Sequence, residues 1–80
     1  MATSTHKPTH VIRCGSLTAA IWHNVGEYGP YFTVTYSRSV RDQKGTWRNL
    51  TSFTLRDLDT VAFLNAQAKE WIAGQVLQPA

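Results

Sequence analysis

The segment from Tyr31 to about Val40 alternates apolar and hydroxyl-bearing side chains, and this alternation restricts the fold more than any other feature of the chain. On an extended backbone, Phe32, Val34 and Tyr36 point to one side and the residues between them point to the other. A repeat of two residues is typical of a strand with one buried face. The segment therefore predicts a strand of an antiparallel sheet whose second face is polar.

Three further segments have the composition of strands separated by turn residues. They cover residues 10–14, 17–25 and 46–53. Gly15-Ser16 is expected to form the first turn, and loops containing glycine are expected at 26–30 and 41–45. Together with the segment that begins at Tyr31, the chain predicts four consecutive antiparallel strands.

The second and fourth predicted strands differ in how clearly their faces can be assigned. Leu17, Ala19 and Ile21 share one side of the second strand, which places Trp22 on the opposite, non-core side. In the fourth strand, Trp47, Asn49, Thr51 and Phe53 alternate with Arg48, Leu50 and Ser52. Both of these sets mix apolar and polar residues, so the sequence does not decide which of them faces the core.

A helix is expected directly after Thr54. Thr54 can cap it, and Asp57, three residues later, can accept a hydrogen bond from the backbone N–H of Thr54, as in a capping box. Gly74 is expected to end the helix. The apolar edge expected to cover the sheet consists of Leu58, Val61, Ala62 and Ile72.

The same helix has more apolar surface than one small sheet needs. The residues that extend this surface sideways are Leu64, Ala68 and Trp71. An apolar surface wider than its own core favours a second copy of the chain, with these three residues at a homodimer interface. The alternative is a core that uses the whole surface.

The predicted fold class is α+β, with a four-stranded antiparallel sheet followed by one C-terminal helix. Residues 1–8 are expected to form a flexible tail and residues 9–75 a single domain. The chain has 80 residues and one cysteine, so an intrachain disulfide is impossible and oligomerisation is the remaining source of added stability. Neither a signal peptide nor a membrane-spanning run is recognisable, which favours a cytoplasmic protein without a membrane partner.

The positive charge lies on the predicted sheet. Residues 1–54 contain six lysines and arginines and two carboxylates, a balance of +4, whereas residues 55–80 have a balance of −1. Aromatic rings can stack on bases, and basic side chains neutralise phosphates. The candidate nucleic-acid-binding residues are Arg13, Trp22, Tyr31, Arg38, Arg41, Lys44, Trp47 and Arg48.

Catalysis has little support in the sequence. Asp57 and Asp59 lie in the first helical turn, where carboxylates favour the helix dipole. His23 has no cysteine or carboxylate at ligand spacing, and Pro8 between His6 and His10 rules out a helical metal pair. We therefore expect no enzyme activity, metal site, cofactor or small-molecule substrate.

The chain resembles the single-stranded-DNA-binding domain of the positive-cofactor-four transcriptional coactivators and their small bacterial and phage relatives. The similar segments lie between Ile12 and Ile72 and comprise residues 19–22, 29–38, 45–48, 52–53, 57–58 and 71–72. The resemblance implies a homodimer in which the helices pack together and the two sheets form grooves for unpaired strands. It also implies a role in transcription, replication or repair.

From these observations we expect binding of single-stranded nucleic acid with little sequence preference, and DNA and RNA are both open. One alternative is a sheet that enters the major groove of duplex DNA. The other is a dimeric protein-interaction module, in which Trp22 and Tyr31 form an apolar hot spot.

Overall fold

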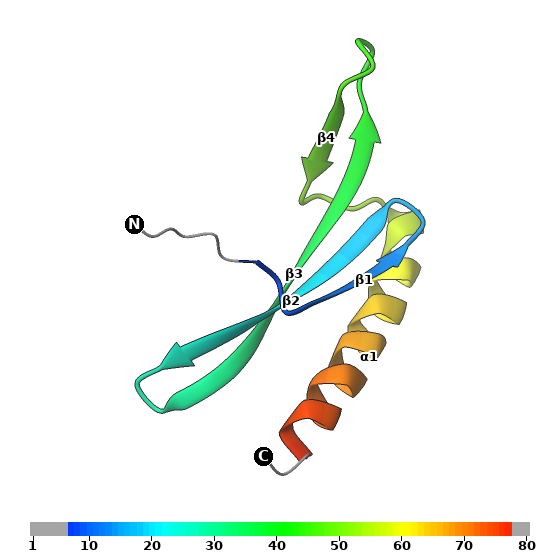
Figure 1. Cartoon of the computed structure of the whole chain (residues 1–80). Coiled ribbons are helices and arrows are strands. Elements are labelled where there is room, and N and C mark those ends of the chain that lie inside the picture. Colours follow the sequence, from blue (N-terminus) through cyan, green and yellow to red (C-terminus); the bar gives the residue numbers. More distant parts are fainter. Residues whose placement is uncertain (1–6, 78–80) are drawn as a thin grey trace, which may run out of the picture.

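The structure, a computed structural model, describes residues 7–77 and the side chains of residues 7–75 (Figure 1). Its elements are β1 (His10–Cys14), β2 (Leu17–Gly26), β3 (Gly29–Arg41), β4 (Trp47–Leu50) and α1 (Leu55–Leu77). The strands form one antiparallel sheet in the order β1-β2-β3-β4, followed by the helix. The predicted α+β fold is thus confirmed. Of the predicted tail, residues 1–6 lie outside the described residues, and Lys7 and Pro8 have no regular secondary structure.

Two predicted boundaries are wrong. β4 ends at Leu50 rather than Phe53, because the chain then turns toward the helix and the Ser52 carbonyl accepts a hydrogen bond from Arg38 Nε at 3.1 Å. This early end explains why the alternation through Phe53 is imperfect. The helix continues past Gly74 to Leu77. Gly74 is not among the glycines with positive φ, and a glycine ends a helix only when it adopts that left-handed conformation.

The long strand β3 joins the two halves of the sheet. Its first ten residues pair with β2, and its last four, Arg38 to Arg41, pair with β4. Two hairpins consequently project in opposite directions from the centre of the sheet, β2–β3 at one end and β3–β4 at the other (Figure 1). The register is continuous in both hairpins, so every residue of β3 has a defined face.

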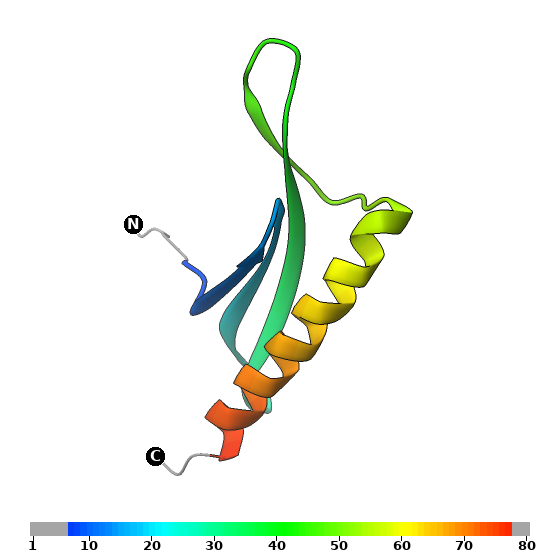
Figure 2. The same cartoon turned by 90° about the vertical axis from the view of Figure 1, so that its right-hand side faces the viewer.

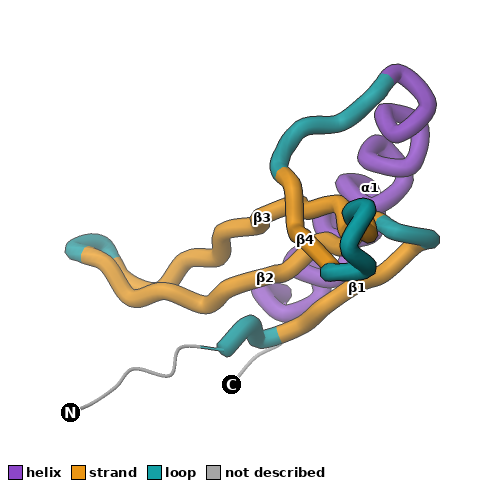
Figure 3. Tube along the Cα trace, turned by 90° about the horizontal axis from the view of Figure 1, so that it is seen from above, coloured by secondary structure: helices purple, strands orange, loops and turns teal. Residues whose placement is uncertain are grey.

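The core lies between one face of the sheet and α1, which packs against that face only (Figures 2 and 3). The buried apolar residues are Leu17, Ala19 and Ile21 of β2 and Leu64 and Ala68 of α1. The predicted core face of β2 is therefore confirmed. At the edge of this core, the Tyr36 hydroxyl donates to Asn65 Oδ1 at 3.0 Å, and partial burial raises the pKa of Tyr36, which keeps this donor protonated.

The helix meets the sheet with only part of the apolar edge that the sequence predicts, and Val61 packs against the core as expected. Leu64 and Ala68, expected at a dimer interface, are buried within the single chain, whereas Leu58 and Ala62, expected to cover the sheet, are exposed. Leu64 and Ala68 lie four residues apart on one helical face, which the hydrophobic pattern alone could not distinguish from the neighbouring apolar face. These two residues cannot contact a second copy.

The start of α1 is fixed by a network around Asp57. Asp57 Oδ2 accepts hydrogen bonds from the backbone N–H and the hydroxyl of Thr54, each at 2.9 Å. The first of these bonds confirms the role predicted for Asp57, whereas the Thr54 hydroxyl donates to that carboxylate and so caps the helix only indirectly. Arg38 of β3 adds an ion pair, with 3.3 Å between its Nε and Asp57 Oδ2. The two bonds from Thr54, and then the charge of Arg38, lower the pKa of Asp57. The carboxylate thus connects the sheet to the first turn of the helix.

We expect Asp57→Asn to destabilise the protein at neutral pH, and we expect the difference in stability between the variant and the wild type to disappear in acid. Because the pKa of Asp57 is lowered in the folded state, its contribution is complete above the unfolded-state pKa near 4. The contribution is then lost as the pH falls through the folded-state pKa. Urea denaturation of both proteins between pH 7 and pH 2 would measure this, and an equal difference at all pH values would contradict it.

We expect Leu64→Ala to reduce the free energy of unfolding by about 2–5 kcal/mol, because it leaves a cavity in the small core. Leu55→Ala is the matched control, since Leu55 is 84% exposed and occupies the same helix. The control should change the free energy of unfolding by less than about 0.5 kcal/mol. Denaturation at a protein concentration low enough to keep the chain monomeric measures both. A small loss at Leu64 would place this residue outside the core.

Candidate nucleic-acid interface

The register of the strands assigns each side chain to one of two faces, because directly paired residues point to the same side. One face packs against α1. We call the other the open face, since no described element covers it (Figure 2). Its residues are Val11 and Arg13 of β1, Thr18, Ala20, Trp22 and Asn24 of β2, Tyr31, Thr33, Thr35, Ser37, Ser39 and Arg41 of β3, and Trp47 and Asn49 of β4.

Five of the eight predicted binding residues lie on the open face: Arg13, Trp22, Tyr31, Arg41 and Trp47. Lys44 lies in the loop between β3 and β4. Arg38 and Arg48 belong to the opposite face, because Arg38 pairs with Leu17 and Leu50, and Arg48 pairs with Val40. The predicted set is therefore divided between two sides of the sheet.

The two arginines on the opposite face have carboxylate partners. Arg38, whose side chain is 20% exposed, bonds to Asp57 and to the Ser52 carbonyl, so its role is to hold the start of α1. Arg48 Nε lies 3.5 Å from Asp42 Oδ2. Phosphate binding by Arg38 stays a prediction, and its ion pair with Asp57 competes with that role.

Trp22 lies at the centre of the open face and is partly buried there. Its Nε1 donates to Thr35 Oγ1 at 2.9 Å, and Asn24 Nδ2 donates to Thr33 Oγ1 at 3.0 Å. These cross-strand bonds place the indole among the hydroxyls of β3. The predicted face of Trp22 is confirmed, and its stacking role stays a prediction.

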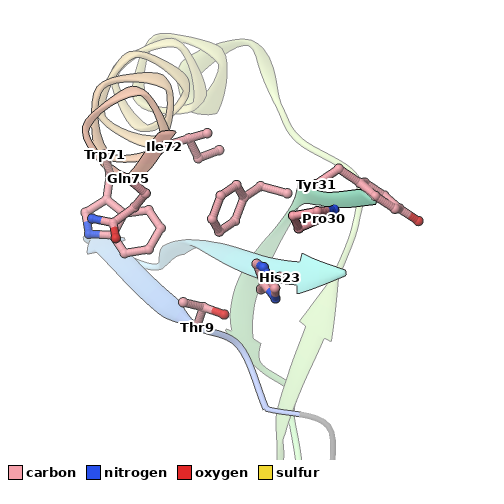
Figure 4. A pocket seen from close by; sticks show the side chains of 8 residues that line it. Thr9, His23, Pro30, Tyr31, Trp71, Ile72 and Gln75 are labelled. Atoms are coloured by element: carbon pink, nitrogen blue, oxygen red, sulfur yellow. The ribbon is translucent and has the colours of Figure 1, made fainter. Parts of the chain in front are cut away.

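Tyr31 lies near the end of the β2–β3 hairpin and is 51% exposed. Its ring covers Gly26 so closely that a Cβ on that residue would lie 2.9 Å from Tyr31 Cε1. Glycine at position 26 therefore lets the ring lie against the backbone of β2. Tyr31 also lies at the edge of a hollow beneath the hairpin, and its ring points outward from it (Figure 4).

That hollow lies on the helix side and has a volume of about 910 Å³. Phe32 and Trp71 line it, with an edge-to-face contact of 5.9 Å between their ring centroids, and Trp71 also stacks on His10 at 4.7 Å (Figure 4). Trp71, predicted at a dimer interface, is thus partly covered by β1 and β3. No arginine or lysine between residues 7 and 77 lines the hollow, so it lacks the charge that phosphates require.

The β3–β4 hairpin presents an arginine and a tryptophan together. The Arg41 guanidinium lies 5.9 Å from the Trp47 ring centroid, and Trp47 is 66% exposed. Asp42 organises the loop beside them, since its Oδ1 accepts the backbone N–H groups of Lys44 and Thr46, each at 2.9 Å. The loop that the sequence marks only as basic is therefore a structured turn.

The carboxylates of the described chain are absent from the strands. Glu27 and Asp42 occupy turns, and Asp57, Asp59 and Glu70 belong to α1. Arg13 and Arg41 form no ion pair with any residue between 7 and 77. The open face therefore combines uncompensated positive charge with hydroxyls and aromatic rings.

One part of the open face has no counterpart in the sequence prediction. A notch of about 390 Å³ lies between the β1–β2 turn and β4. Its residues are Arg13, Gly15, Ser16, Thr18, Ser39 and Trp47. Only the pairing of four strands brings these six together, so no local sequence signal could have indicated the notch.

Within residues 7–77, no three histidine, cysteine or carboxylate side chains are placed to hold a metal ion. The helix of this region does not combine the length and the apolar character that crossing a bilayer requires. Comparison of the chain with protein families, with curated proteins and with solved structures finds no match. The assignment of function consequently depends on the geometry of the sheet.

Proposed function

We propose that the open face of the sheet binds single-stranded nucleic acid with little sequence preference, as the resemblance to the positive-cofactor-four family implies. The single observation that supports this most is the gathering of Arg13, Arg41 and Trp47 on one face that has no carboxylate on its described strands. The cations neutralise phosphates, and the ring offers a stacking surface to any base. The function is binding without a catalytic step, in transcription, replication or repair.

Unpaired strands suit this surface better than a duplex. Trp47 and Tyr31 are more than half exposed, so each presents a ring to solvent. They lie near opposite ends of the face, because Tyr31 is near the start of β3 and Trp47 pairs with Arg41 at its end. A duplex hides the flat sides of its bases, whereas an unpaired strand can turn them toward aromatic rings. The hydroxyls between the two rings, on Thr33, Thr35 and Ser37, can donate hydrogen bonds to phosphate oxygens.

We expect Arg13→Ala and Arg41→Ala to weaken binding of a single-stranded oligonucleotide regardless of its sequence. Each lost phosphate contact should lower the slope of log affinity against log salt concentration by about 0.7. Arg56→Ala is the matched control, because it removes the same charge from an exposed position on α1, beyond the sheet. Fluorescence anisotropy titrations at several salt concentrations measure the slopes.

Three results would contradict this proposal. A duplex of equal length that binds as tightly as the single strand would favour insertion into the major groove. An Arg56→Ala effect equal to that of Arg13→Ala would show that only net charge matters. No binding to either nucleic acid at low salt would favour a protein-interaction module.

We also propose that the protein is a homodimer through the side of α1 that faces away from the sheet. Leu55 and Leu58 are exposed there, at 84% and 51%, and Ala62 and Ala66 continue the same side. Small side chains let two helices approach closely, and the core of the single chain is small. This side takes the place of the buried Leu64 and Ala68 in the proposed interface.

We expect the protein to sediment as a dimer at micromolar concentration and Ala66→Glu to shift it toward monomer, because a carboxylate would be buried between the helices. Gln67→Glu is the control, since it places a charge one residue away, on the side of α1 next to β1. Sedimentation equilibrium distinguishes the species. A wild-type monomer, or equal effects of the two substitutions, would exclude this interface.

A further inference from the structure

We propose that the notch on the open face admits one unpaired nucleobase of a bound strand and thereby anchors the strand on the sheet. The inference builds on the proposed single-strand binding and names a subsite within it. Its basis is the meeting of an aromatic wall, a floor of hydroxyls and a cationic rim in one recess.

Four strands and one turn form the notch. Ser39 of β3 lies at its centre, where the Ser39 backbone N–H donates to the Ser16 carbonyl at 2.8 Å on one side. On the other side Ser39 pairs with Asn49 of β4, and its hydroxyl donates to Asn49 Oδ1 at 3.1 Å. The β1–β2 turn and β4 are thus held against opposite edges of β3. The recess between them is part of the folded sheet and needs no rearrangement to form.

Trp47 supplies the wall. Its side chain is 66% exposed, and the Arg41 guanidinium near its ring is not among the groups that line the notch. The cation therefore leaves the recess open. A base that enters can stack on the indole, which is the interaction by which aromatic platforms bind bases of any sequence.

Hydroxyls of Ser16, Thr18 and Ser39 supply polar groups inside the recess. A hydroxyl can both donate and accept, so it can pair with the edge of any of the bases. Ser39 already donates to Asn49, which leaves its oxygen as an acceptor. The volume of about 390 Å³ lies in the range of roughly 300–1,000 Å³ that is typical of small-ligand sites.

Arg13 supplies the charge at the rim. Its side chain is exposed and has no ion-pair partner between residues 7 and 77, so it is available to the phosphate beside an inserted base. No carboxylate of the described residues lines the notch, which makes a metal cation or an amine a poor occupant. A free anion would need no aromatic wall. A nucleobase attached to its phosphate is the ligand that uses all three features.

The test compares two single strands of equal length, oligothymidylate and a strand with the same sugar–phosphate backbone but without bases. We expect Trp47→Ala to lower affinity for oligothymidylate by about five- to a hundredfold, the effect of losing one stacked base. Affinity for the abasic strand should not change. Thr18→Val should lower affinity for oligothymidylate by about two- to tenfold, the effect of one hydrogen bond. Thr51→Val is its matched control, because it makes the same change at an exposed position that follows β4 and lies outside the notch.

The possible results distinguish a failure of the notch proposal from a failure of the proposed single-strand binding. A wild-type protein that binds neither strand overturns both. Binding in which Trp47→Ala affects the two strands alike, or in which Thr51→Val lowers affinity as much as Thr18→Val, overturns the notch alone. Melting curves check that the variants fold, and if Thr18→Val unfolds, Ser39→Ala replaces it with the same expectation.

Discussion

The contact between α1 and β2 determines which face of the sheet is covered and which face remains exposed for binding. Leu64 of the helix packs on Leu17 and Ala19 of β2. Together with Ile21 and Ala68 they are the buried residues of the described chain. Alternation along β2 then sends Thr18, Trp22 and their paired neighbours to the open face. A helix packed on the other side of the sheet would cover these residues and leave the apolar side chains of β2 in water. The small apolar contact therefore positions the whole candidate site.

β3 extends this division into a core face and an open face over the whole sheet. It pairs with β2 along most of its length and with β4 at its end, so its side-chain order continues from one hairpin into the other. Tyr31 near its start and Arg41 at its end are an even number of residues apart and so share the open face. The notch forms where the neighbours of β3 change, around Ser39, because there a turn and a short strand lie on its two edges. A single long strand thus links the exposed tyrosine, the cation and the recess.

The arginines of the sheet form two groups, those paired with a carboxylate and those without such a partner among residues 7–77. Arg38 is bound by Asp57 at the start of α1, and Arg48 lies beside Asp42 in the β3–β4 loop. Arg13 and Arg41 lie on the opposite side of the sheet, and neither forms an ion pair with a residue between 7 and 77. Counting arginines in the sequence cannot separate the two groups, since all four lie in or beside similar strand segments. Of these four, only Arg13 and Arg41 combine the open face with the absence of a carboxylate partner among residues 7–77.

The sequence by itself determined the element order, the core face of β2, the capping of α1 by Thr54 and Asp57, and the position of Trp22 on the outer side. These features depend on interactions between residues a few positions apart, so a local pattern is enough to predict them. The tertiary structure alone decided that Leu64 and Ala68 are core, that Arg38 pairs with Asp57, and that Arg13, Thr18, Ser39 and Trp47 meet in one notch. These outcomes depend on strand register and on the rotation of the helix about its axis. Both are set by packing between segments distant in sequence, and the pattern within any one segment is compatible with more than one arrangement.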